Sequence, residues 1–316
     1  MVTRMRPVPL LGLPSIPLGA GVAVISPASY ASQEPFDRGL RRLRDLGFSP
    51  HTGAHTQARG PLFHAGTPQD RISDLHAAFA DPAAAILAAV RGGYGSNYLL
   101  GLIDLELVGN NAKPFFAYSD LTGMQLMLLD RLGIPAFHGP MVAADFAPED
   151  GVHLGSLRAA LDGQPYSVGE AEGLRTLRPG TARGTLYGGC LSILAALIGT
   201  PWEPATENRL LFIEDVGVKP YQVDRMLWQM RQAGKFAGVC GVVFGEMLHC
   251  TADAAQAELL DQVIVEAFRD FNVPIAIGLR SGHVSRQNVT LTFGAQAELE
   301  ASGAPQLRLL QPVVTR

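Results

Sequence analysis

The feature that most constrains the fold is a regular alternation of short apolar runs with longer amphipathic ones. Residues 20–25, 83–90 and 115–118 are almost entirely apolar, as is typical of strands buried on both faces of a parallel sheet. Residues 35–48 and 67–82 instead carry apolar side chains at helical spacing and reach a glycine or proline near the end. Strands that alternate with helices predict βαβ units and a parallel sheet.

A change in composition divides the chain in two. Residues 165–183 are rich in glycine, proline, threonine and charge, and we interpret them as the linker between two domains, with a first hairpin. A chain of 316 residues is long enough for two separate cores. We therefore expect an α/β protein with an N-terminal Rossmann- or flavodoxin-like parallel-sheet domain (residues 1–164), a C-terminal mixed β/α domain (residues 184–316) and an active site in the cleft between them.

Composition excludes several classes of protein. Hydrophobic residues make up 47% of the chain and charged residues 17%, which describes a well-packed globular protein. The net charge of −4 and the lack of a long basic run do not fit a nucleic-acid-binding protein. The histidines show no metal-ligand spacing, and no stretch reaches the ~18 apolar residues of a membrane helix. The cysteines form no CxxC pair, so buried, inert thiols are expected at Cys190, Cys240 and Cys250.

The first residues resemble a weak signal peptide, because two arginines precede an apolar segment. Four prolines interrupt that segment: Pro7, Pro9, Pro14 and Pro17. The run at residues 20–25 fits a first core strand better, so we expect a cytoplasmic enzyme.

Ser119 lies at an abrupt corner, where the apolar run ending at Tyr118 gives way to a helical pattern over residues 121–132. Serine is favoured at helix N-caps, where its oxygen accepts a free backbone N–H. A serine at a strand-to-helix corner also suits a nucleophile with backbone donors beside it. The corner alone leaves both interpretations open.

Three further stretches end predicted strands, where the chemistry of parallel sheets gathers. The glycine turn "RGGYGS" (residues 91–96) is either a plain turn or, beside Ser119, the source of a second donor for an oxyanion hole. Glu214 directly follows a buried run, and its neighbour Asp215 is equally suited to capping the next helix. His283 lies in the loop after the strand predicted at residues 274–279. A lone histidine is more often structural, as we expect for His138.

A serine, a carboxylate and a histidine form the set that a serine hydrolase needs. The histidine removes the serine proton, and the carboxylate orients the imidazole and stabilises its charged form. The chain order Ser119, Glu214, His283 is that of α/β-hydrolases, but "AYSDL" lacks the G-x-S-x-G elbow. The set would therefore occupy a different corner on a different fold.

Several motifs together resemble the LD-carboxypeptidase family, in which murein tetrapeptide carboxypeptidases match best and microcin C self-immunity peptidases are relatives. They are "RGGYGS", "AYSDLT", "HGPM", "YGGCLSILAALIGTPW", "LFIEDVGVKPYQVDRML" and "GLRSGHVSRQNVTLTFG", and they span about residues 19–299 in the order of the family. The resemblance implies a triad of Ser119, Glu214 and His283, with an oxyanion hole formed by the N–H groups of Asp120 and Gly93. The sequence departs from the family in having Cys190 where asparagine is common and "LTFG" where L-P-x-G is common.

The resemblance also implies an activity. The family's murein enzymes are cytoplasmic serine hydrolases that remove the terminal D-alanine from a murein tetrapeptide in peptidoglycan recycling, without a metal or other cofactor, and known members suggest a homodimer. Arg91 is suited to the substrate carboxylate, although a structural salt bridge fits it equally well. Tyr94 and Asn97 are candidates to line the same pocket.

Two alternative functions remain open at this point. A peptidase of the microcin C type would cleave a peptidyl-nucleotide and would need an aromatic platform for the base. The chain offers Trp202 and Trp228, and the helical pattern around Trp228 predicts a core position. A non-catalytic α/β ligand-binding module would use Ser119 only as an N-cap and the glycine turn as a ligand contact.

Overall fold

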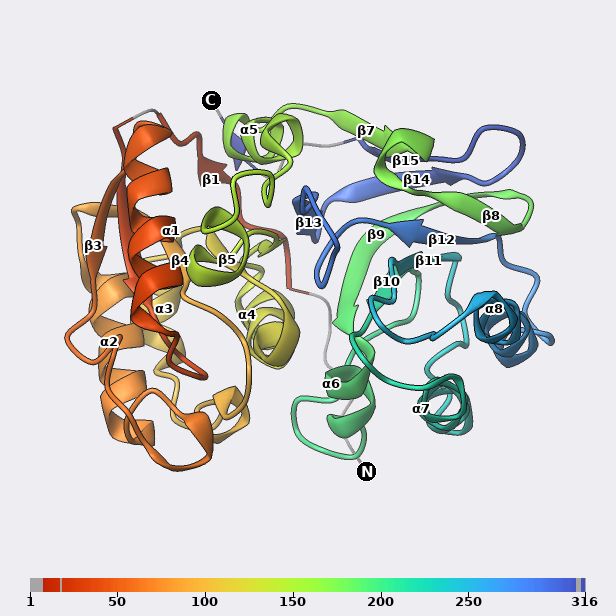
Figure 1. Ribbon diagram of the computed structural model, residues 1–316, viewed down its shortest axis with the longest axis horizontal. Coiled ribbons are helices and arrows are strands. Elements are labelled where there is room, and N and C mark those ends of the chain that lie inside the picture. Colours follow the sequence, from red (N-terminus) through yellow and green to blue (C-terminus); the bar gives the residue numbers. More distant parts are fainter. Residues whose placement is uncertain (1–7, 18, 311–313, 316) are drawn as a thin grey trace.

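Two sheets with flanking helices lie side by side in the computed structural model, which describes residues 8–17, 19–310 and 314–315 (Figure 1). The arginines of the possible leader fall outside the described residues. A short parallel pair, β1 (Leu13–Pro14) and β16 (Val314–Thr315), joins segments from opposite ends of the chain. The expected α/β class with two sheets, one rich in parallel strands and one mixed, is confirmed.

The N-terminal sheet has six strands in the order β13-β6-β5-β4-β2-β3. Its five parallel strands are β2 (Gly21–Ile25), β3 (Ser49–Thr52), β4 (Ala84–Ala89), β5 (Phe115–Ala117) and β6 (Ala136–His138). Numbered by their occurrence in the chain, these run 2-1-3-4-5, the flavodoxin-like order. In such sheets ligands bind beyond the carboxyl ends of the strands, near the point where the order reverses, which here lies between β2 and β4.

Five helices accompany this sheet: α1 (Gln33–Asp45), α2 (Pro68–Ala80), α3 (Leu105–Asn110), α4 (Thr122–Leu132) and α5 (Leu154–Asp162). A capping box between Thr67 and Asp70 begins α2, as its sequence suggests. Residues 122–129 of α4 are all buried, because this helix packs against both β6 and β9 and so lies between the two sheets. Its mostly apolar sequence reflects that double contact.

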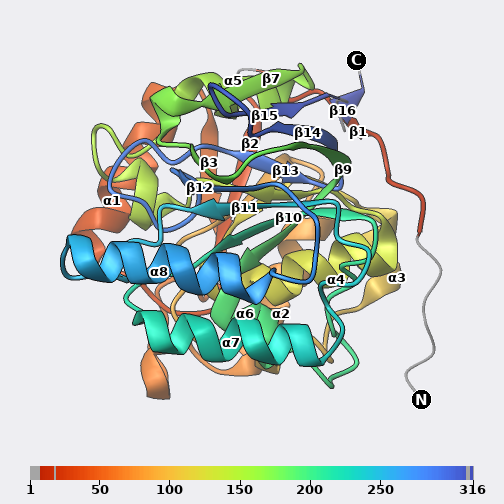
Figure 2. The ribbon, with the colours of Figure 1, turned by 90° about the vertical axis from the view of Figure 1, so that its right-hand side faces the viewer.

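The C-terminal sheet has eight strands in the order β7-β15-β14-β9-β10-β11-β12-β8. Its parallel centre consists of β9 (Thr181–Cys190), β10 (Arg209–Glu214), β11 (Gly241–Gly245) and β12 (Ile275–Leu279). Antiparallel strands flank it: β7 (Tyr166–Gly169), β8 (Arg175–Arg178), β14 (Gln296–Glu300) and β15 (Gln306–Leu309). The helices that follow its strands are α6 (Leu191–Ala196), α7 (Pro220–Gln232) and α8 (Ala254–Ala267), and Figure 2 shows α7 and α8 side by side over the sheet.

The division between the sheets differs from the one read from the sequence. Residues 165–183 contain β7 and β8, which lie at opposite edges of the eight-stranded sheet and therefore do not form the expected hairpin. Strand β13 (Leu291–Phe293) lies in the chain between β12 and β14 of the C-terminal sheet, but it pairs antiparallel with β6 of the N-terminal sheet. Local patterns predict that these strands exist, but they carry no information on which distant strand each one joins.

The expectation for Trp228 was wrong, because its side chain is 60% exposed on α7. This helix turns Val223, Leu227 and Met230 toward the core. Trp228 follows Leu227 by one residue, which rotates its side chain about 100° around the helix axis and away from that face. Tyr221, two turns earlier, is similarly exposed at 62%.

The glycines of β9 yield a prediction about stability. Gly188 has a φ of 142°, and a Cβ there would lie 1.8 Å from the carbonyl oxygen of Phe212 on the neighbouring strand. Gly188→Ala is therefore expected to cost more than about 3 kcal/mol or to prevent folding. Gly199 also has a positive φ, of 80°, but open space around it, so Gly199→Ala should cost only about 1–2 kcal/mol. Urea unfolding of both variants tests the difference, and equal midpoints would contradict it.

Candidate active site

Ser119 lies on a strained corner directly after β5. Its φ of 65° is in the left-handed region that non-glycine residues rarely adopt. Ser119 is partly exposed, whereas its neighbours Tyr118 and Asp120 are buried. The Ser119 hydroxyl makes no hydrogen bond to any described residue, and it does not cap α4. The N-cap interpretation is therefore not what the structure shows.

The glycine turn packs directly against this corner. A Cβ added to Gly92 would lie 2.9 Å from the Ser119 Oγ, so the turn approaches this closely only as glycine. Two hydrogen bonds lock the segments together. The Ser96 N–H donates to the Asp120 carboxylate at 2.8 Å, and the Ser96 hydroxyl donates to the Asp120 carbonyl at 2.7 Å.

Ser29, in the loop after β2, holds the other end of the turn. Its hydroxyl accepts from the Tyr94 N–H at 3.1 Å, and its own N–H donates to the Gly92 carbonyl at 3.3 Å. Gly93 has a φ of 109°, and a Cβ on it would lie 2.4 Å from the Ser29 hydroxyl. Across the described part of the chain, no hydrogen bond engages the N–H of Gly93 or that of Asp120.

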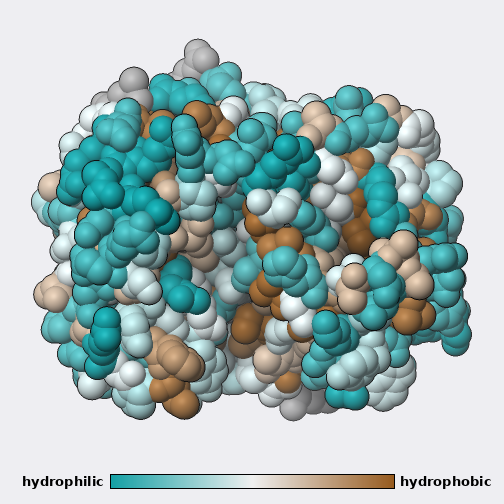
Figure 3. Space-filling model, viewed as in Figure 1, coloured by the Kyte–Doolittle hydropathy of each residue, from teal (hydrophilic) through white to brown (hydrophobic). Residues whose placement is uncertain are grey.

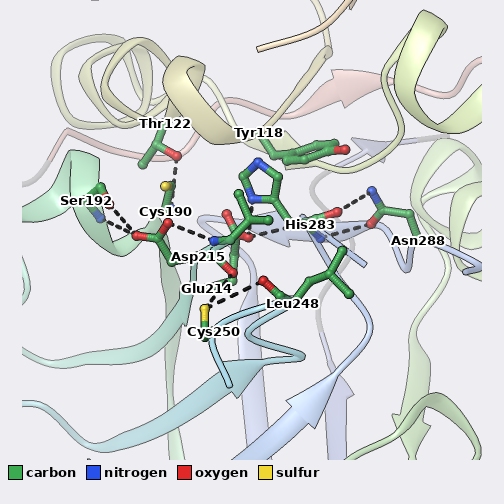
Figure 4. A network of polar contacts seen from close by, with 12 residues as sticks. Tyr118, Thr122, Cys190, Ser192, Glu214, Asp215, Leu248, Cys250, His283 and Asn288 are labelled. Atoms are coloured by element: carbon green, nitrogen blue, oxygen red, sulfur yellow. Dashed lines mark hydrogen bonds and ion pairs between the residues drawn. The ribbon is translucent and has the colours of Figure 1, made fainter. Parts of the chain in front are cut away.

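Glu214 and His283 form a close pair. The Glu214 Oε2 accepts from the His283 ring Nδ1 at 2.7 Å and from the His283 backbone N–H at 3.0 Å (Figure 4). Because Nδ1 faces the carboxylate, the proton of the neutral ring is held on Nδ1, which leaves Nε2 as the basic nitrogen. The sequence placed these two residues at separate strand ends, and the structure brings them into contact.

Burial and mutual charge set the pKa values of this pair. Burial raises the pKa of Glu214, but the charge and hydrogen bonds of His283 outweigh it, and the net pKa is below its usual value. Burial lowers the pKa of His283, but the charge and hydrogen bond of Glu214 outweigh it, and the net pKa is above 6.5. The two shifts agree, since each partner stabilises the charged form of the other.

Two glycines make room for the Glu214 side chain. A Cβ on Gly245 would lie 2.7 Å from the Glu214 Cβ, and one on Gly282 would lie 2.6 Å from its Cδ. The second carboxylate oxygen, Oε1, is buried without a hydrogen bond to a described residue. His138 is fully buried, and neither of its ring nitrogens has a hydrogen bond to a described residue. Burial lowers the pKa of that ring to about 4. His138 is therefore a neutral neighbour of the pair.

Asp215 is buried and does not cap the helix that follows it, α7, whose N-cap is Lys219, so the capping role expected from the sequence is wrong. One carboxylate oxygen accepts from both the N–H and the hydroxyl of Ser192, at 2.8 and 2.5 Å, and the other accepts from the Val216 N–H at 2.8 Å (Figure 4). These bonds tie the end of β10 to the start of α6.

The corner and the histidine loop meet at the domain interface. The ring of Tyr118 lies edge-on against that of His283, with 5.2 Å between centroids. Thr122, on the other side of the corner, accepts from the Cys190 N–H at 3.1 Å. Among the described residues, no hydrogen bond joins the Ser119 hydroxyl to His283. In the space-filling view a furrow separates the two halves of the molecule (Figure 3).

The three residues expected to bind substrate are all exposed. Arg91 makes no ion pair within the described ranges, so the alternative of a structural salt bridge does not apply to it. Tyr94 is 42% exposed, and its hydroxyl lies 3.4 Å from that of Tyr98. Asn97 is exposed on the same turn.

The cysteines are free thiols. Burial, with the nearby charges of Glu214 and Asp215, raises the pKa of Cys190 well above its usual value, and burial raises that of Cys250 to about 11. Cys240 is partly exposed, which corrects the expectation for that residue. In the described ranges no group of three or more potential metal ligands occurs, and no helix is long and apolar enough to cross a membrane.

Comparison with family models identifies both halves of the chain. Residues 22–139 match the model of the LD-carboxypeptidase N-terminal domain, and residues 183–299 match that of the C-terminal domain. The matched ranges contain Ser119, Glu214 and His283.

Individual relatives agree with these matches. The chain is 33% identical over 290 residues to the probable murein peptide carboxypeptidase of Bacillus subtilis, covering 90% of each protein. It is 30% identical over 302 residues to the murein tetrapeptide carboxypeptidase of Pseudomonas aeruginosa, covering 90% of this chain and 95% of that protein. A crystal structure of an MccF-like protein from Bacillus anthracis superposes with a TM-score of 0.88 at 25% identity, covering 95% of this chain and 99% of that one.

The Glu214–His283 pair leads to a prediction about pH. Glu214→Gln removes the charge that raises the pKa of His283, so that pKa should fall below its value in the unaltered protein. The His283 ring therefore becomes neutral at a lower pH. An NMR titration of the His283 ring protons measures the shift.

Glu246→Gln is the matched control, because Glu246 accepts from the Ser285 N–H in the same loop at 2.9 Å but does not touch the His283 ring. This variant should leave the His283 pKa nearly unchanged. Equal titration curves for the two variants would refute the assignment of Glu214 as the dominant charge.

Proposed function

Because the chain belongs to the LD-carboxypeptidase family, we propose that it is a serine peptidase that removes the C-terminal D-alanine from a murein tetrapeptide. The observation that carries the proposal is the buried Glu214–His283 pair at the domain interface, next to Ser119 on a strained corner. Relatives named as murein peptide and murein tetrapeptide carboxypeptidases support the substrate class.

The first step forms an acyl-enzyme. His283 Nε2 takes the proton of the Ser119 hydroxyl as Ser119 Oγ attacks the carbonyl carbon of the bond that precedes D-alanine. The oxyanion accepts hydrogen bonds from the N–H groups of Asp120 and Gly93. His283 then gives the proton to the leaving amine, the C–N bond breaks, and free D-alanine departs.

The second step releases the shortened peptide. His283 takes a proton from water, the resulting hydroxide attacks the ester carbonyl, and the proton returns to Ser119 as its bond to the acyl group breaks. In both steps Glu214 stabilises the imidazolium while it exists. Each oxyanion donor typically contributes about 10²- to 10³-fold to such a rate.

The scheme requires the Ser119 hydroxyl and the His283 ring to form a hydrogen bond with substrate present. Such contacts are often long in proteins without substrate and tighten in the complex. The positions of Tyr118 against His283 and of Thr122 against Cys190 already hold the corner against the C-terminal domain.

The substrate's free carboxylate needs a cationic partner. We propose Arg91, whose exposed guanidinium adjoins the glycine turn and is not engaged by a described carboxylate. Arginine binds carboxylates through two parallel hydrogen bonds. Tyr94 and Asn97 complete the same rim. A cytoplasmic location and a homodimer are further parts of this proposal, by analogy with the family.

A second candidate is cleavage of a peptidyl-nucleotide. The exposure of Trp228 favours it, because this aromatic side chain is not buried in the core and is free to stack on a base. The fold likeness to an MccF-like protein is compatible with it. It ranks second because the relatives at 30% identity or more quoted above are named for murein peptides.

Incubation with a murein tetrapeptide tests the proposal. The peptide should lose the mass of one alanine residue, and Ser119→Ala should lower the rate by about 10⁴-fold or more. A serine-directed reagent should label Ser119, and chelators should leave turnover unchanged. A peptidyl-nucleotide offered in parallel measures the second candidate directly.

The controls separate catalysis from folding and purity. Ser285→Ala removes an exposed hydroxyl in the same loop as His283 and should retain full activity. A murein tripeptide should stay intact. Undiminished turnover by Ser119→Ala would exclude this serine as the nucleophile, and absence of turnover on either substrate would favour a ligand-binding module.

A further inference from the structure

The loop that carries His283 crosses from one domain to the other. It begins at β12 in the eight-stranded sheet and ends at β13 in the six-stranded sheet. Its last part is fastened to the N-terminal domain, since the backbone of residues 287–288 forms three hydrogen bonds with residues 150–153, at 2.8, 2.8 and 3.1 Å. The position of the His283 ring therefore depends on contacts from both domains.

Asn288 holds the residue directly before His283. Its side-chain Oδ1 accepts from the Gly282 N–H at 3.0 Å, and its Nδ2 donates to the Gly282 carbonyl, also at 3.0 Å (Figure 4). The same Nδ2 donates to a carboxylate oxygen of Asp145 at 3.1 Å. The amide orientation follows from its partners, because a flipped amide would place its NH₂ against the Gly282 N–H. Asn288 is fully buried.

Asp145 binds both residues that hold His283 from the N-terminal side, Asn288 and Tyr118. Its Oδ1 accepts from Asn288 and from the Tyr118 hydroxyl, the latter at 3.3 Å, and its Oδ2 accepts from the Met141 N–H at 2.8 Å. Tyr118 in turn packs its ring edge-on against His283. Asp145 lies in a π-helical turn (Val142–Phe146), an uncommon conformation that frequently marks functional sites.

The charges around Asp145 are few. Burial raises its pKa to about 6, and the hydrogen bonds from Met141, Asn288 and Tyr118 limit that rise. No described lysine or arginine forms an ion pair with it. The charged group that acts on it is His283, while Glu214 and Asp215 act on His283 from the C-terminal side. Above its own pKa, Asp145 therefore adds a negative charge on the N-terminal side of the imidazole.

We propose that Asp145 is a positioning residue for His283, which it orients through Asn288 and Tyr118 and whose protonated form it stabilises from across the domain interface. Asp145 touches none of the reacting atoms. A carboxylate from each domain thus supports His283. Glu214 contacts its ring directly, whereas Asp145 acts through Tyr118 and Asn288. The kinetic part of the test rests on the proposed hydrolase function, whereas the titration of His283 does not.

Asp145→Asn tests the charge with little change of shape. The amide can retain one acceptor for Asn288 and Tyr118, but its NH₂ replaces the oxygen that accepts from the Met141 N–H. With murein tetrapeptide at pH 8, kcat should fall by about 10- to 100-fold, as for a displaced catalytic group, while KM changes little. The His283 pKa measured by NMR should fall, and the acid limb of the kcat/KM profile should move to lower pH.

Asp130→Asn is the matched control. Asp130 is also a carboxylate at the domain interface, it accepts from the Tyr187 hydroxyl at 2.7 Å, and burial raises its pKa to about 6. No triad residue is among the groups that shift its pKa. Asp130→Asn should therefore leave kcat within about twofold and the His283 pKa unchanged, even where it alters thermal stability.

Tyr118→Phe covers the case in which Asp145→Asn does not fold. It removes only the hydroxyl that donates to Asp145 and keeps the ring against His283. Its kcat should fall by about 3- to 10-fold, the effect of one hydrogen bond, with KM unchanged.

The outcomes separate this inference from the proposed function. An unchanged His283 pKa and an unchanged kcat in folded Asp145→Asn would overturn the inference, even if Ser119→Ala is inactive. If Asp145→Asn does not fold, an unchanged kcat in Tyr118→Phe would overturn it. A lowered His283 pKa in Asp145→Asn, together with full activity in Ser119→Ala, would support the inference and exclude Ser119 as the nucleophile of the proposed function.

Discussion

The structure of the site depends on one interaction, the hydrogen bond between the buried Glu214 carboxylate and the ring of His283. A carboxylate without solvent is costly unless it is paired and hydrogen-bonded. Here a single oxygen accepts both from the ring and from the backbone N–H of the same residue. The surrounding sequence serves this contact, since Gly245 and Gly282 leave the space that the Glu214 side chain fills.

The two halves of the proposed site are built differently. The oxyanion side is local to the N-terminal domain, where Ser96 binds Asp120 and Ser29 binds the glycine turn. These three loops follow β2, β4 and β5, which are neighbouring parallel strands, so the sheet itself places them together. The base side has no such common scaffold, because the loop of His283 starts in one sheet and ends in the other. It needs side-chain contacts from both domains to define its position.

What the sequence could predict follows the same division. Residues 83–90 and 115–118 show their strands by local apolarity. Ser119 and Glu214 stand out because they lie where such strands end, and His283 stands out in the short loop after a third strand. Asp145 carries no local signal, since an aspartate before a turn is usually exposed, and two of its partners, Tyr118 and Asn288, are distant in sequence. The return of β13 to β6 and the edge positions of β7 and β8 are long-range pairings that composition does not encode. Helical periodicity did not predict the exposure of Trp228, because its neighbour Leu227 is on the buried face of α7 and the next residue already points away from it.

This asymmetry bears on how the proposed reaction is controlled. A change in the angle between the domains leaves the oxyanion donors and Ser119 in place relative to one another, because all of them belong to the N-terminal domain. The same change moves His283 relative to Ser119, because Glu214 ties the histidine to the C-terminal sheet. The position of His283 relative to Ser119 is therefore the feature of the proposed site that depends most on interdomain geometry. Among the described residues, no hydrogen bond joins the two. Asn288 and Tyr118 oppose such movement, since they couple the histidine loop to Asp145 in the N-terminal domain, which also carries Ser119. In the proposed reaction, substrate that contacts both domains would bring the Ser119 hydroxyl and the His283 ring into hydrogen-bonding distance.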